Sequence, residues 1–161
     1  MADWQVGFNV VPRRALARHG AAKASSSSSA SWWQDNALPS DLQHRLGGIA
    51  PAELPGTAEH RSWGIEDGNR IDIWYDAGQV SAVTAQVDVR RLDSKFSATL
   101  LQFVRTADAV LVRSDGLVVE PEIGAYAASL RSAGAWKFAS DPGTFLASYA
   151  ADDDTDDGSE R

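Results

Sequence analysis

The sequence predicts a single two-layer α+β domain whose sheet is mainly antiparallel. Three observations lead to this fold class: two alternating strands lie within residues 61–91, an amphipathic helix follows at once, and a second hairpin and helix begin near residue 109. Two consecutive strand-strand-helix units of this kind can share one sheet and place both helices on one of its faces. We therefore expect one domain over residues 1–151.

The first hairpin consists of two runs with the period of two that half-buried strands have. The apolar positions are Ile71, Ile73 and Tyr75 in the first run and Val83, Ala85, Val87 and Val89 in the second. A two-residue turn at Ala77-Gly78 would place the two apolar sets on opposite faces of the sheet. We therefore expect a connection of three or five residues, which sets Ile73 opposite Val83. Ile71 then faces Ala85.

Polar residues of the same hairpin share the opposite, outward face. In the expected register this face carries Asp72, Thr84 and Asp88. We expect both carboxylates to be exposed and to form surface ion pairs with the neighbouring Arg70 and Arg90.

The N-terminal part is expected to begin with a strand over residues 4–11 that Pro12 ends. Residues 13–31 contain no acid and are rich in alanine, serine and arginine, which favours a flexible loop inside the domain. An organellar transit segment has a similar composition, but Asp3 and the strand before the segment fit that interpretation poorly. Residues 40–46 then form a short helix that Ser40 can cap.

The C-terminal half contains the second hairpin and its helix. An amphipathic helix is expected over about residues 93–107, with Asp93 or Ser94 as its cap. Residues 109–113 and 117–120 flank a Ser-Asp-Gly turn, and their continuous apolar character predicts strands in the middle of the sheet.

Pro121 suits the first turn of the next helix, which ends near Gly134. The apolar face of this helix carries Ile123, Tyr126, Ala127 and Leu130. Residues 135–139 are a short strand candidate, and Asp141-Pro142 opens a last helix.

The composition predicts the cellular compartment and excludes several kinds of chemical site. Hydrophobic residues make up 43% of the chain, with no run of about 18 apolar residues and no signal-peptide core, so a cytoplasmic protein that does not enter membranes is expected. The absence of cysteine excludes disulfides, thiolate catalysis and cysteine-ligated metal centres.

The charge is concentrated at the C-terminus. Residues 152–161 carry six acids and one base, which account for −5 of the formal net charge of −7. We expect a disordered acidic tail that either solubilises the protein or attracts a basic partner. The remaining body is nearly neutral and has no basic stripe, which argues against nucleic-acid binding.

No residue set predicts catalysis or a cofactor. The three histidines, His19, His44 and His60, lie outside the predicted core and are not expected to share a metal site. Nucleophile and phosphate-loop motifs are absent from the sequence. The outward carboxylates are the only acid-base candidates, and their arginine neighbours offer them a simpler role as ion-pair partners.

The chain contains six tryptophans, three of which belong to the candidate interaction surface. Trp74 alternates with Ile73 and Tyr75 and should point away from the hydrophobic face. Three interpretations remain open: the N-terminal segment folds over this face, a protein partner covers it, or it forms a groove for a small molecule or sugar. The candidate surface consists of Trp74, Asp72, Thr84, Asp88, Trp32 and Trp33.

Four sequence stretches carry a resemblance. The run WGIEDGNRIDIW, followed by QVDVRRLDSKF, ADAVLVRSDGLVVEP and AWKFASDPGTFL, resembles small uncharacterised bacterial proteins of about this length, to which no reaction is attached. The resemblance covers roughly residues 61–147. The stretch LPSDLQHRLGG is similar to a helix segment of SUKH-type immunity domains, which implies a role in binding a toxin but assigns no functional residue here.

Together these observations predict a non-enzymatic cytoplasmic protein that acts by binding a protein partner, and an immunity-type binding protein is one form of this function. The alternative is a small enzyme or ligand-binding domain that uses the outward carboxylates beside Trp74. The two differ in one respect: an enzyme needs a pocket where these carboxylates converge, whereas a binding protein needs an exposed complementary patch. The oligomeric state does not follow from the sequence.

Overall fold

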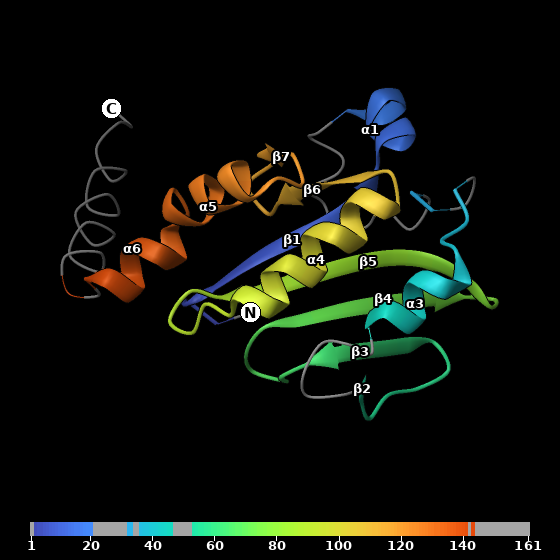
Figure 1. Cartoon of the computed structure of the whole chain (residues 1–161), viewed down its shortest axis with the longest axis horizontal. Coiled ribbons are helices and arrows are strands. Elements are labelled where there is room, and N and C mark those ends of the chain that lie inside the picture. Colours follow the sequence, from blue (N-terminus) through green and yellow to red (C-terminus); the bar gives the residue numbers. More distant parts are fainter. Residues whose placement is uncertain (1, 21–31, 34–35, 47–52, 142, 144–161) are drawn as a thin grey trace, which may run out of the picture.

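The structure, a computed structural model, describes residues 2–20, 32–33, 36–46, 53–141 and 143. In this part of the chain a seven-stranded antiparallel sheet and five helices form an α+β fold (Figure 1). None of the described helices is long and apolar enough to cross a membrane. The acidic tail, most of the expected loop at residues 13–31 and the expected last helix after Asp141 lie outside the described residues, Gly143 apart.

The sheet has the strand order β2-β3-β4-β5-β1-β6-β7. Its strands are β1 (Gln5–Pro12), β2 (Glu53–Leu54), β3 (His60–Gly64), β4 (Arg70–Asp76), β5 (Gln79–Asp88), β6 (Ala109–Arg113) and β7 (Val118–Val119). The helices are α1 (Arg13–His19), α3 (Ser40–Leu46), α4 (Ser94–Thr106), α5 (Ile123–Arg131) and α6 (Gly134–Ser140).

The β4–β5 hairpin has the expected register but reaches it by a different route. Ile73 pairs with Val83 and Ile71 with Ala85, as predicted. The turn nevertheless has two residues, Ala77-Gly78, both with positive φ, as tight hairpin turns require. A β-bulge at Ser81 adds one residue to β5 and restores the register between the turn and the body of the hairpin.

Strand β1 joins the two halves of the sheet. It pairs with β5 on one side and with β6 on the other, so the first strand of the chain separates the two hairpins. The sheet is therefore not made of two strand-strand-helix units alone. The second hairpin also lies nearer the edge than expected: β6 is interior, but β7 has only two residues and forms the edge strand.

The two faces of the sheet differ in chemistry. The first face is apolar at its centre and includes Phe8, Ile71, Ile73, Val83, Ala85, Val87 and Leu111, all buried. The second face carries Asp72, Trp74, Thr84 and Asp88, together with Asn9 of β1.

Helices α4 and α5 run antiparallel beside each other over the first face (Figure 1). The side chain of Asp93 caps α4 by accepting from the backbone N–H groups of residues 95 and 96, as the sequence predicted. Tyr126 of α5 contacts Phe8 of β1, with ring centroids 6.2 Å apart. Buried Arg113 of β6 donates to the carbonyl of Ser129, which ties the end of α5 to the sheet.

Two elements differ from the sequence prediction. Residues 13–19, expected in a loop, form helix α1, whose basic last turn suits the negative end of the helix dipole. The strand candidate at residues 135–139 is helix α6. Its sequence contains alanines but no β-branched residue, which favours a helix where no strand partner is near.

Candidate functional site

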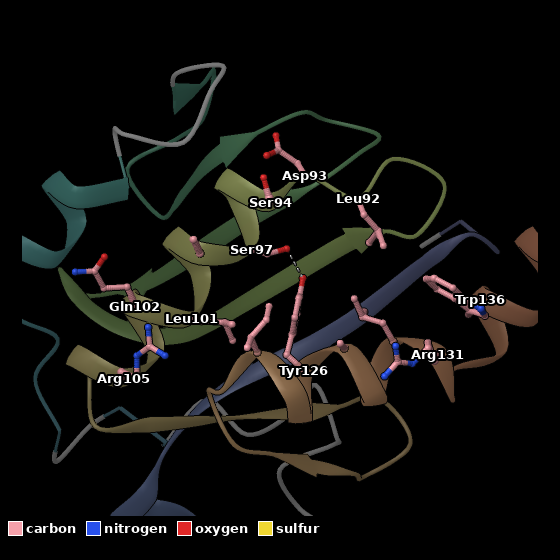
Figure 2. A pocket seen from close by; sticks show the side chains of 14 residues that line it. Leu92, Asp93, Ser94, Ser97, Leu101, Gln102, Arg105, Tyr126, Arg131 and Trp136 are labelled. Atoms are coloured by element: carbon pink, nitrogen blue, oxygen red, sulfur yellow. Dashed lines mark hydrogen bonds between the residues drawn. The ribbon is translucent and has the colours of Figure 1, made fainter.

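A groove of about 650 Å³ lies between α4 and α5 and continues to α6. Its wall is mainly apolar and includes Leu101 on α4, Leu130 on α5 and Trp136 on α6. Figure 2 shows Leu92 and Trp136 at one end of the groove and Arg105 at the other. The volume is in the range of pockets that bind ligands or the anchoring side chains of a partner.

The groove exists because small side chains line it between larger ones. Ala98 on α4 and Ala127 on α5 lack the volume to fill the space between two neighbouring helices. Large apolar residues near both ends stay exposed: Leu92 to 50% and Ile123 to 66%. Leu92 precedes α4 and Ile123 begins the antiparallel α5, so large exposed apolar residues lie towards both ends of the groove.

A buried pair of hydroxyl groups lies in the groove. Ser97 Oγ and Tyr126 Oη are 3.1 Å apart and face each other across the two helices (Figure 2). Burial raises the pKa of Tyr126 above its usual value, and the hydrogen bond with Ser97 offsets only part of this effect. The neutral phenol is therefore favoured in the folded state.

Stability should fall at alkaline pH because of Tyr126. The unfolded phenol ionises near its usual pKa of about 10, while the folded phenol keeps its proton to higher pH. The contribution of Tyr126 to stability is thus constant below about pH 10 and declines as pH rises from there through the folded-state pKa. Tyr126→Phe should show a shallower alkaline decline in thermal midpoint than the wild type, and identical slopes would contradict this assignment.

Positive charge lies at the groove. Arg105 donates to the carbonyl of Pro121 at one end, and Arg131 has no hydrogen bond or ion pair within the described ranges. The only carboxylate among the described lining residues, Asp93, is engaged in capping α4. The groove therefore combines an apolar wall with one arginine towards each end and one carboxylate that is already engaged.

The predicted surface residues lie on the second face, but only part of that surface is accessible. Trp74 is 43% exposed and Thr84 is half-buried. Trp32 and Trp33 are buried against the core, and the indole N–H of Trp33 donates to the carbonyl of Val10. These two tryptophans thus cover part of the second face themselves.

The expectation of exposed carboxylates is wrong for both Asp72 and Asp88, each only 2% exposed. Asp72 accepts from Arg70 Nε at 2.9 Å through one oxygen and lies 2.8 Å from His60 Nε2 through the other. The ring of His60 stacks on Trp74, with centroids 3.8 Å apart. Asp72 therefore uses both oxygens to anchor neighbouring side chains.

Asp88 belongs to a separate network near the end of β5. It accepts from the backbone N–H and the guanidinium of Arg90, which in turn lies 3.9 Å above the ring of Trp4. Burial opposes ionisation of Asp88, but the hydrogen bonds from Arg90 outweigh it and hold the pKa of the carboxyl below its usual value. Asp72 and Asp88 do not converge on one pocket.

A second cavity, of about 440 Å³, opens on the second face. Its lining includes Trp32, Trp33 and Trp74 and the polar residues Asn9, Ser81 and Thr84. It therefore brings together four of the six predicted surface residues, and neither Asp72 nor Asp88 is among its described lining residues.

No metal centre is indicated within the described ranges, where no three histidine, aspartate or glutamate side chains gather closely enough to bind an ion.

No model of a known protein family, no curated protein sequence and no solved structure matches this chain.

The sequence did not predict the α4–α5 groove. Ile123, Tyr126, Ala127 and Leu130 were expected to form one apolar stripe, but only Tyr126 and Leu130 are buried. The signal in the sequence was weak. Alanines on two helices leave a hollow only if those helices pack side by side, which the sequence does not show.

Proposed function

We propose that this protein is a binding module that holds an acidic amphipathic helix of a partner protein in the α4–α5 groove. The observation that carries the proposal is a preformed, apolar-lined groove between two helices with large exposed apolar residues towards both of its ends. A helix laid into such a groove buries apolar side chains at positions i, i+3 or i+4, and i+7.

The dimensions support a helical occupant. Lining residues on α4 extend from Ser94 to Arg105, which is about 16 Å of groove at 1.5 Å per residue. A partner helix of about three turns spans this length. The alanines at 98 and 127 allow its backbone to approach closely, which a smaller ligand would not require.

The charges support an acidic occupant. Arg131 carries a charge with no partner among the described residues, and Arg105 lies at the opposite end (Figure 2). An acidic residue towards either end of the partner helix would pair with one of them. Complementary charges of this kind favour the correct partner and increase the association rate.

The alternative, an enzyme or ligand site built on the outward carboxylates, has less support. Both oxygens of Asp72 and both oxygens of Asp88 already pair with side chains of the same face.

An immunity-type role is one form of the binding function proposed here. The stretch on which that resemblance rests, residues 38–48, supplies no described lining residue of the groove.

Display selection on the full chain tests the proposal. A library of helical peptides of about 15 residues should yield binders with an apolar stripe and at least one acidic residue. Ile123→Asp and Arg131→Glu should each weaken a selected peptide at least tenfold, because the first places a charge on the apolar area and the second removes the charge complement.

Two matched substitutions serve as controls. Ile65→Asp changes another exposed isoleucine outside the groove, and Arg14→Glu reverses another exposed arginine, on α1. Both should leave peptide affinity unchanged. Peptides that bind Ile123→Asp as tightly as the wild type, or a groove occupied by a second copy of the chain in a concentration-dependent dimer, would contradict the proposal.

A further inference from the structure

We propose that the cavity on the second face is a binding site for a neutral carbohydrate of one or two sugar rings. The site lies on the opposite face of the sheet from the α4–α5 groove and does not depend on the function proposed for that groove. Four features of the described residues lead to this inference.

The first feature is an exposed aromatic ring that is held in place without a ligand. The ring of Trp74 stacks on His60 at an interplanar angle of 12°, His60 is anchored by Asp72, and Asp72 is anchored by Arg70. Trp74 still exposes 43% of its surface and lines the cavity. A fixed, accessible indole is a suitable platform for the apolar C–H face of a sugar ring, since little side-chain freedom is lost on binding.

The second feature is an unsatisfied donor. Trp32 lines the cavity and is only 6% exposed. Its indole Nε1 is buried and has no hydrogen-bond partner within the described part of the chain. Trp33, its neighbour, donates its own indole N–H to a backbone carbonyl. A buried donor without an acceptor costs about 1–3 kcal/mol, and a ligand hydroxyl or ring oxygen would recover part of this cost once the Trp32 ring turns its N–H towards the cavity.

The third feature is neutrality. The described lining contains no ionisable side chain; its polar groups are an amide and two hydroxyls, from Asn9, Ser81 and Thr84. A charged ligand would lose its hydration there without gaining a counter-charge. Aromatic rings combined with neutral hydrogen-bonding groups match a polyhydroxylated ring, which is apolar on its faces and polar around its edge.

The fourth feature is the β-bulge. Ser81 is the extra residue of β5, so it lies outside the regular ladder, and it lines the cavity beside Trp74. Bulges re-aim side chains and occur frequently next to binding sites. The irregularity that corrects the hairpin register therefore also adds a hydroxyl-bearing residue to the cavity.

Titration of the full chain with glucose, galactose, N-acetylglucosamine, maltose and cellobiose tests the inference. Intrinsic tryptophan fluorescence and calorimetry should detect saturable binding of at least one of these sugars. Trp74→Ala should lower the affinity at least tenfold because it removes the platform. Thr84→Val keeps the side-chain shape, removes the hydroxyl, and should lower the affinity several-fold.

Controls separate a specific site from general effects on folding. Trp4→Ala, which removes a half-buried tryptophan outside the cavity, should leave sugar affinity unchanged, and circular dichroism should confirm that all variants are folded. Glucuronate and glucosamine should bind at least tenfold more weakly than glucose. Failure of the whole sugar panel to bind, equal affinity for Trp74→Ala and wild type, or equal affinity for charged and neutral sugars would overturn the inference.

Discussion

Val87→Asp is expected to unfold most of the protein at neutral pH. Val87 is 1% exposed on the first face, where it pairs with Val6 of β1. A carboxylate at this position would be buried among apolar side chains with no partner, at a cost of about 4 kcal/mol or more. This is a large part of the 5–15 kcal/mol by which domains of this kind are stable.

Asp88→Asn is the matched comparison, because Asp88 is the next residue and equally buried. Here the carboxylate has partners, and asparagine keeps one acceptor oxygen while losing the charged hydrogen bonds to Arg90. We expect a loss of about 1–3 kcal/mol. Urea midpoints of the two variants should therefore differ widely, and comparable midpoints would contradict the assignment of faces.

The pH dependence adds a second test of Asp88. Because its folded-state pKa lies below the unfolded value of about 3.8, the carboxylate contributes stability above that pH and loses it as pH falls through the folded-state pKa. The stability difference between wild type and Asp88→Asn should therefore shrink below about pH 4.

Gly64→Ala should be strongly destabilising. Gly64 has φ of +122°, a region that side chains rarely adopt, and an added Cβ would overlap the carbonyl oxygen of Asn69. That carbonyl accepts from Ile65 N, and the side chain of Asn69 accepts from the backbone N–H of Asp88. Displacing Asn69 disturbs both the β3–β4 turn and the end of β5, so we expect a loss of about 3 kcal/mol or more.

Gly124→Ala provides the control for this substitution. Gly124 lies in the first turn of α5, and an added Cβ there meets no atom within 4 Å. Alanine favours a helix over glycine by up to about 1 kcal/mol, so this variant should be as stable as the wild type or slightly more. Equal thermal midpoints for Gly64→Ala and Gly124→Ala would show that the β3–β4 turn tolerates a side chain.

The β4–β5 hairpin illustrates how local and tertiary effects combine. Alternation along each strand is sufficient to predict that Ile73 lies opposite Val83, because burial of one face leaves only one favourable register. It does not predict the turn, since a bulge can insert the missing residue. The structure has a two-residue turn, which suits the local turn chemistry, and the bulge at Ser81 still sets Ile73 opposite Val83, as burial of one face requires.

Asp72 shows which property of a residue the sequence does not predict. The face of Asp72 was correctly predicted from the strand period, but its burial was not, because burial depends on residues far away in the sequence. Its partner His60 is on the neighbouring strand, opposite Trp74. A histidine and an aspartate twelve positions apart carry no recognisable signal until β3 and β4 pair.

The local pattern of apolar residues, caps and turns was sufficient to predict the α+β class, the β4–β5 pairing and the beginning of α4, because each depends on neighbours within a few positions. The insertion of β1 between β5 and β6, the burial of Trp32 and Trp33, and both cavities depend on contacts between distant segments. Such contacts are set by how whole elements fill the available space, and no short stretch of sequence contains that information.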